Sequence, residues 1–260
     1  SEVGQRNLEA TNLTTYAYSE GRVGYMAINV KQIPDQKVRQ AIFYALNTKD
    51  IDDAVFLSDE YYDIPTSFLP PTSEFYTDNV EKYDQDVEKA KELLTEAGYA
   101  DGFDLAIAVP SVYEFHMQTA EVVVEQLKAV GINATIDAVE WNTWLEDVYT
   151  NREYQATISG ITCSDLTPGY LLNRFQTDSK KNFVNFKSTE YDELWKATQA
   201  TQDAAEKAAD YKKLQTILAD EAASAFIQVP ANTTAFNKNL AGYKFYPIYV
   251  QDMSTVYFVK

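Results

Sequence analysis

Cysteine and histidine are almost absent from this sequence, which holds one of each, Cys163 and His116, in 260 residues. A lone cysteine has no internal partner, so a scaffold stapled by disulfides is excluded. One histidine and one cysteine also cannot supply a common zinc site, and we expect neither a metal nor a cofactor. We interpret Cys163 as a small buried side chain and His116 as a surface residue near the start of a helix.

Long apolar runs and an excess of cations are missing as well. No run approaches the roughly 20 residues that a membrane helix needs, so we expect no membrane span. The 22 Lys and Arg residues face 39 Asp and Glu residues, a net charge of −17. Nucleic acid is therefore excluded as a partner, because phosphate binding needs clustered Lys and Arg. Ser1–Glu20 has no signal-peptide pattern, which predicts a cytoplasmic chain or the mature part of an exported one.

The common catalytic motifs are not present either. The sequence has no G-x-S-x-G, P-loop, H-E-x-x-H or Rossmann glycine pattern. A nucleophile–base pair of Cys163 and His116 has no motif around it to support it. We therefore expect a protein that is not an enzyme, and we keep a hydrolase using Asp165 or Cys163 as the competing hypothesis.

Hydrophobic spacing defines the first half of the chain. Tyr25–Asn29 is typical of a short strand, and Asp35 is placed to cap a helix whose apolar residues recur at helical spacing. Asp84 is placed to cap a second helix, and Gly98 stands where a glycine commonly ends one.

The middle of the chain alternates strands and helices with short connections. The predicted order is a strand at Leu105–Val109, a helix at Tyr113–Val130, a strand at Ile132–Val139, a helix from Trp141 and a strand at Tyr154–Gly160. This alternation predicts a parallel sheet that is covered by helices.

Helices and then strands complete the chain. Two helices are predicted at Thr189–Ala200 and Asp203–Ala223, and the segment Phe226–Lys260 is typical of several short strands. Because these strands follow an α/β unit, we expect them to pair with a sheet other than the middle one.

Candidate binding residues follow from position rather than motif, because ligands of open α/β sheets lie outside the carboxyl ends of the parallel strands. Those ends offer aromatic contact area and polar groups. The candidates are Tyr113, Trp141, Thr162, Ser164 and Asp165. Two of them have structural alternatives: Trp141 lies three residues before Trp144 on an apolar stripe that suits core packing, and Asp165 suits a simple turn.

Several stretches then match a known family in order and in spacing. They are Gly24–Asn29, Pro34–Asn47, Tyr83–Asp84, Ala90–Phe103, Gly131–Ile132, Glu140–Trp141 and Tyr211–Ala222. With them the chain resembles the C-terminal half of a family 5 extracellular solute-binding protein, the oligopeptide- or dipeptide-binding component of an ABC importer.

The resemblance implies a fold and a division of the chain. The implied fold class is α/β, a periplasmic-binding-protein-like (type II) lobe with a helix-covered mixed, largely parallel sheet. Residues 1–20 would be an entry segment from a missing N-terminal lobe, 21–230 the ligand-binding lobe, and 231–260 a β-rich tail returning to the first lobe.

The resemblance also implies partners and a location. The lobe would capture peptides in a cleft against the missing lobe and deliver them to an ABC permease, outside the cytoplasm and with a lipid anchor. Phe183 and Asn185 fall where family members line the cleft.

Peptide-binding members commonly have Gly-Trp and, three residues after the Trp, an Asp. Here Ile161 follows Gly160, and Asp165 is offset by one residue. A modified peptide, a sugar or another solute therefore stays an alternative ligand, and a sensor or interaction module that does not transport stays an alternative function.

Overall fold

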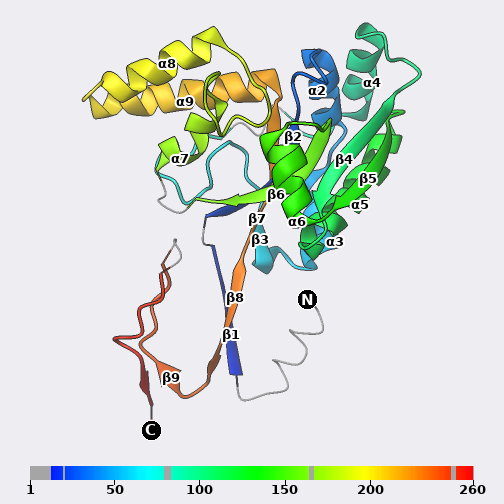
Figure 1. Ribbon diagram of the computed structural model, residues 1–260. Helices are drawn as coiled ribbons and strands as arrows, with labels where there is room; N and C mark the ends of the chain where they lie inside the picture. The colour runs from blue at the N-terminus through cyan, green and yellow to red at the C-terminus, as the bar shows by residue number, and fades with distance from the viewer. Residues whose placement is uncertain (1–12, 20, 79–82, 164–166, 247–249, 260) are drawn as a thin grey trace.

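A six-stranded mixed sheet forms the centre of the computed structural model, which describes residues 13–19, 21–78, 83–163, 167–246 and 250–259 (Figure 1). In spatial order, the strands are β3 (Tyr62–Asp63), β7 (Ser224–Pro230), β2 (Arg22–Ile28), β6 (Ala156–Thr162), β4 (Asp104–Pro110) and β5 (Asn133–Val139).

The parallel half of the sheet is the predicted strand–helix unit. β4 pairs in parallel with both β5 and β6, and α5 (Glu114–Lys128) connects β4 to β5. The next connection begins as α6 (Trp141–Thr143) and continues as the π-helical segment η3 (Trp144–Thr150). The expectation of a parallel sheet covered by helices is confirmed for these strands.

The other half of the sheet is antiparallel. β2 pairs antiparallel with β6 and β7, and β3 pairs antiparallel with β7. The sheet is mixed, as expected, but the description "largely parallel" is wrong. We expected the strands after residue 226 to pair with a sheet other than the middle one. This prediction is wrong for β7, because β7 pairs with β2 in the middle sheet and buries Ile227 and Val229 there.

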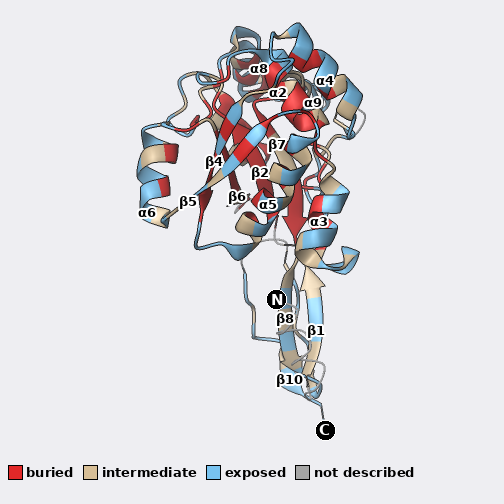
Figure 2. Ribbon diagram, turned by 90° about the vertical axis from the view of Figure 1, so that its right-hand side faces the viewer, coloured by how far each residue is buried: buried red, intermediate tan, exposed pale blue. Residues whose placement is uncertain are grey.

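Helices cover both faces of the sheet, and each face has its own apolar core. On one face lie α2 (Gln36–Tyr44), α3 (Thr48–Phe56), α4 (Val87–Glu96) and α5. On the other lie η3, α7 (Pro168–Leu172), η4 (Asn173–Phe175), α8 (Thr189–Ala200) and α9 (Ala204–Glu221). Figure 2 shows the buried residues concentrated in the strands between these layers. Burial of this apolar surface is the main favourable term in folding.

Side-chain caps fix where the helices begin. Asp35 accepts a hydrogen bond from the Lys37 backbone N–H at the start of α2, as predicted. The cap of α4 is Asp86 rather than Asp84, and it accepts from Lys89 at 2.8 Å. Either aspartate satisfies the capping rule, and the sequence spacing did not distinguish them.

A two-stranded ribbon extends away from the body of the molecule (Figures 1 and 2). It consists of β1 (Leu13–Tyr18) and β8 (Asn232–Asn237), which pair antiparallel, and a small pair of β9 (Leu240–Ala241) with β10 (Tyr257–Phe258) lies beyond it. A short helix, η1 (Asp59–Tyr61), immediately precedes β3. The division at residues 20 and 230 into lobe and tail stays a prediction.

Candidate functional site

The carboxyl ends of β4 and β5 bring Tyr113 and Trp141 together. The two strands end level, with Pro110 opposite Val139, and the Ser111 backbone N–H donates to the Val139 carbonyl at 2.9 Å. Tyr113 then stands at the start of α5 and Trp141 at the start of α6. Their ring centroids are 5.6 Å apart in an edge-to-face arrangement. Sequence position alone therefore located an aromatic pair at this edge.

Trp144 packs against this pair from the side of the apolar core. The Trp141 ring stacks on the Trp144 ring with centroids 5.3 Å apart and planes 4° from parallel. Trp144 is 3% exposed, and its Nε1–H donates to Thr157 Oγ1 at 2.9 Å. Thr157 Oγ1 in turn donates to the Ala108 carbonyl on β4. Trp144 is thus the core residue of the two, whereas the half-buried Trp141 offers one part of its surface to solvent.

The carboxyl end of β6 forms the third part of the site, beside the ends of β4 and β5. Thr162 is half-buried and lies opposite Arg22 of β2. Cys163 is buried, as predicted, and its backbone N–H donates to the Gly21 carbonyl at 3.0 Å. Ser164 and Asp165 lie outside the described residues, so their part in the site stays a prediction.

His116 is a buried residue, and its interpretation as a surface residue is wrong. The side chain is 2% exposed and contacts the Tyr113 ring, and its Nδ1 has no hydrogen-bond partner among the residues that the structure describes. Burial, assisted by the charge of Arg22, lowers the pKa of His116 to about 3. A Cβ on Gly160 would approach the imidazole to 3.1 Å, so the ring fills the space beside that glycine. The signal was available in the sequence, because residues 116, 120, 123 and 127 share one helix face.

Phe183 belongs to an aromatic core deeper in the same layer. It is 6% exposed, and its ring contacts those of Tyr25, Trp144, Tyr149 and Tyr154. Through Trp144 it is connected to the Tyr113–Trp141 pair, but it does not lie at the exposed edge.

Asn185 lies at the opposite end of the sheet from Thr162. Its side-chain oxygen accepts from Arg152 at 3.1 Å, and its side-chain nitrogen donates to Asn29 Oδ1 at 2.8 Å. Asn29 follows the end of β2, and Arg152 precedes β6. The backbone of Asn185 has φ 56°, a left-handed conformation that asparagine tolerates better than most residues. These hydrogen bonds hold Asn185 away from the carboxyl ends of β4, β5 and β6, and its part in ligand binding stays a prediction.

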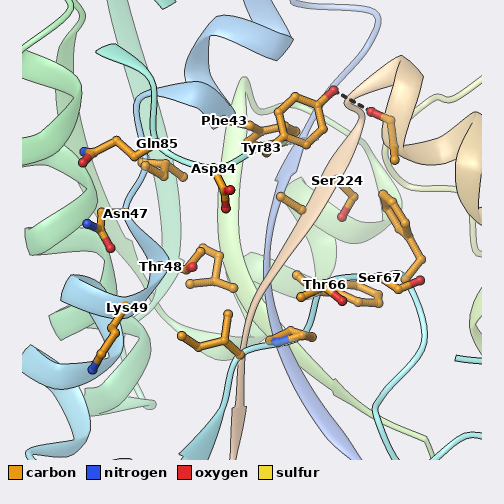
Figure 3. Close-up of a pocket in the computed structure, with 18 residues that line it drawn as sticks. Phe43, Asn47, Thr48, Lys49, Thr66, Ser67, Tyr83, Asp84, Gln85 and Ser224 are labelled. Carbon is orange, nitrogen blue, oxygen red and sulfur yellow. Dashed lines mark hydrogen bonds between the residues drawn. The ribbon is translucent and has the colours of Figure 1, made fainter. Parts of the chain in front are cut away.

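A cavity of about 500 Å³ opens elsewhere, along β7 near the other edge of the sheet. Figure 3 shows Thr66, Ser67, Tyr83 and Asp84 around it. Most of its polar groups already have partners: Thr66 bonds Tyr76, Ser67 bonds Gln215, and Tyr83 Oη donates to the Ala219 carbonyl. None of the predicted site residues lines this cavity, and its lining favours a structural gap over a ligand site.

A cluster of metal-ligating side chains and a membrane-spanning helix are both absent from the described residues. No three His, Cys, Asp or Glu side chains among them are grouped closely enough to hold a metal ion. Nor does any helix in the described ranges have the length and apolar composition to cross a bilayer. The strand ends instead present aromatic surface, which gives contact area at a low entropic cost.

Comparison with known proteins identifies the family. Residues 4–183 match the bacterial extracellular solute-binding proteins, family 5 Middle. The chain belongs to this family. The resemblance inferred from the sequence is confirmed, and family 5 proteins provide the reference for the fold and for the function proposed below.

Individual relatives agree with the family match. The chain is 30% identical to the dipeptide-binding protein of Escherichia coli over 239 residues, which are 87% of this chain and 44% of the relative. It is 29% identical to the oligopeptide-binding protein AppA of Bacillus subtilis over 252 residues, or 90% of this chain and 46% of the relative. The chain thus spans about half the length of the curated relatives it matches.

The fold is shared with solved structures of this type. The ABC transporter substrate-binding protein CtaP from Listeria monocytogenes superposes with a TM-score of 0.92 at 26% identity, covering 100% of this chain and 55% of that one. The periplasmic-binding-protein-like (type II) α/β fold expected from the sequence is confirmed.

Proposed function

We propose that this chain is one lobe of a solute-binding protein that captures peptides in a cleft against a second lobe and delivers them to an ABC importer permease. The observation that carries the proposal is the family 5 match over residues 4–183, together with relatives named for dipeptide and oligopeptide binding. The family description, extracellular, supports a location outside the cytoplasm. The proposal includes a lipid anchor on the longer protein.

The proposed binding surface of this lobe is the edge at the carboxyl ends of β4, β5 and β6. Tyr113 is 38% exposed there, and Trp141 stands behind it with its ring fixed by Trp144. Thr162, Ser164 and Asp165 would complete the edge, with Asp165 accepting from a cationic group. Closure of a second lobe would exclude water, so that hydrogen bonds to a peptide backbone become stronger.

Alanine substitution tests this surface in the longer protein that carries the chain. Tyr113→Ala should weaken the binding of Ala-Ala by about tenfold in calorimetry, because it removes aromatic contact area and leaves Trp141 less well packed. Tyr99→Ala is the matched control, since Tyr99 is 42% exposed and contacts only the Phe103 ring among the described aromatic residues. Equal losses in both variants would contradict the assignment of the edge.

The proposal includes that the peptide leaves unchanged. Incubation with a peptide library should yield no cleavage products, and Cys163→Ala should leave binding unaltered because its thiol is 1% exposed. Release of new amino termini that disappears in Cys163→Ala would instead establish the competing hydrolase.

A further inference from the structure

The segment after β6 carries positive charge in a strongly acidic chain. Residues 167–187 hold four cations, Arg174, Lys180, Lys181 and Lys187, and one acid, Asp178, so their net charge is 4 − 1 = +3, against −17 for the whole chain. Two of these cations, Arg174 and Lys181, border one small cavity of about 30 Å³.

Neither of these two cations has an anionic partner among the described residues. Within the described ranges, Arg174 and Lys181 take part in no ion pair. The Nε atom of Arg174 is buried and has no hydrogen-bond partner in the part of the chain that the structure describes. A buried donor without a partner is costly, and more so when it is charged, so its environment favours an added acceptor.

Aromatic contacts hold both cations near the cavity. The guanidinium carbon of Arg174 lies 5.4 Å from the centroid of the Tyr170 ring, and Nζ of Lys181 lies 5.6 Å from the same centroid. Such cation–π contacts restrict long side chains without neutralising their charge. The two positive groups are therefore positioned and still available to an anion.

The cavity adjoins the proposed binding surface. Ile161, the residue before Thr162 in β6, lines it together with Phe183 and Tyr25. The volume has room for a small charged group and not for a whole side chain. A guanidinium fork binds carboxylates in a bidentate manner, which makes a carboxylate the best match.

We propose that Arg174 and Lys181 form a carboxylate subsite beside the end of β6, so that the preferred ligands are peptides that place a carboxylate there. This inference rests on the proposed peptide-binding function and adds the substrate class. The carboxylate is either the C-terminus of the peptide or an acidic side chain, and matched probes separate the two sources.

The side-chain Nε–H resonance of Arg174 gives a direct readout in the ¹⁵N NMR spectrum of the chain. The chain has five arginines, and Arg174→Lys identifies the resonance by its loss. Acetate and Ala-Ala should shift this resonance in a saturable manner, whereas the neutral Ala-Ala amide should bind about tenfold more weakly. Ala-Glu amide and Ala-Gln amide then test whether a side-chain carboxylate substitutes for the C-terminus.

Charge-removing variants complete the test. Lys181→Gln changes an exposed side chain and should reduce the preference for Ala-Ala over its amide several-fold, together with its dependence on salt. Lys180→Gln removes the neighbouring exposed cation, which does not line the cavity, and should leave the preference unchanged. Equal effects of the two variants would reduce the inference to a general effect of charge and overturn it.

The outcomes separate this inference from the proposed function. Equal affinity for Ala-Ala and its amide would overturn the carboxylate subsite and leave peptide binding intact. A shift with acetate, without binding of either peptide by the longer protein that carries the chain, would support the subsite and contradict the peptide proposal. An Arg174 resonance that neither acetate nor Ala-Ala moves, up to tens of millimolar, would overturn the subsite.

Discussion

Two buried titratable side chains, Asp52 and His116, give the stability of this protein opposite dependences on pH. Asp52 on α3 is fully buried, and neither carboxylate oxygen has a hydrogen-bond partner within the described ranges. Burial, with a further contribution from Asp53, raises the pKa of Asp52 to about 9. His116 is neutral in the fold because burial lowers its pKa to about 3. The fold therefore keeps both side chains uncharged at neutral pH.

Asp52 should make the protein less stable as the pH rises. Below pH 4 the carboxyl is protonated in both the folded and the unfolded chain, so its contribution is fully present there. Between pH 4 and about 9 only the folded chain keeps the proton, and the free energy of unfolding falls by at most about 1.4 kcal/mol per pH unit. Asp52→Asn should remove this slope and raise the free energy of unfolding at pH 8 by about 2 kcal/mol or more.

Urea unfolding of both proteins at pH 5 and pH 8 measures this difference. An exposed acid on the same helix supplies a control, because Asp50→Asn removes one charge without changing a buried group. If the free energy of unfolding of the parent and of Asp52→Asn changes equally between pH 5 and pH 8, Asp52 is ionised in the fold. The assignment of Asp52 as a neutral buried carboxyl is then incorrect.

His116 should act on the acid side. Below pH 6.5 the unfolded chain binds a proton that the folded chain does not bind until about pH 3, so stability is present above pH 6.5 and is lost as the pH falls. His116→Phe keeps a ring beside Gly160 and removes the titration. Its free energy of unfolding should therefore fall less between pH 7 and pH 4 than that of the parent, as measured by urea unfolding at each pH.

At the scale of the elements, β4 and β5 each begin two residues after a glycine, Gly102 and Gly131, and these two glycines face each other. Gly102 has φ +78°, and a Cβ there would lie 1.8 Å from the carbonyl oxygen of Gly131. Gly98 has φ +85° as well, but a Cβ there would meet no atom within 4 Å. Gly98 and Gly102 thus share a left-handed backbone conformation and differ in the space around them.

Alanine at Gly98 and alanine at Gly102 should lower the free energy of unfolding by unequal amounts. Gly98→Ala should cost about 1 kcal/mol, the usual penalty of a left-handed backbone for alanine. Gly102→Ala should cost about 3 kcal/mol or more, because the backbone at the start of both strands must also move. Guanidinium unfolding of the two variants measures the difference, and equal costs would show that the Gly131 carbonyl can shift freely.

Local patterns in the sequence were sufficient to predict those elements that are stabilised by contacts among their own residues. The helix at Thr189–Ala200 has the predicted bounds, since Ser188 caps it and its apolar spacing is regular. The pairing of β7 with β2 depended on contacts nearly 200 residues apart, which no local pattern encodes. The π-helical form of η3 was likewise not predictable, because its apolar spacing also suits an α-helix.

The candidate site was predictable to the extent that topology determines it. The strand-end rule brought Tyr113 and Trp141 into contact because both follow strands that end level. The same rule says nothing about Arg174 and Lys181, which reach their cavity from the helices and loop after β6. It also did not apply to Asn185, whose position came from the resemblance and whose hydrogen bonds lie at the other end of the sheet.

At the scale of the whole molecule, the ribbon and the body differ in how they are stabilised. Every buried residue of the two apolar cores lies between Val23 and Val229. The segment beyond β8 instead exposes large apolar side chains, among them Met253, Tyr257 and Phe258, the last 70% exposed. Exposed apolar groups of this kind mark surfaces that pack against another body, as the predicted tail to a first lobe requires.

Residues 21–230 alone should therefore fold. Removing residues 1–20 and 231–260 deletes no residue of either core, so the midpoint of thermal unfolding should change by only a few degrees. Removal of the exposed apolar tail should also reduce self-association in analytical ultracentrifugation. A variant of residues 21–223, which lacks β7 and with it the buried Ile227 and Val229, is the contrasting control and should not fold cooperatively. If the 21–230 variant unfolds as readily as this control, the ribbon is part of the folding unit and the division at residues 20 and 230 is incorrect.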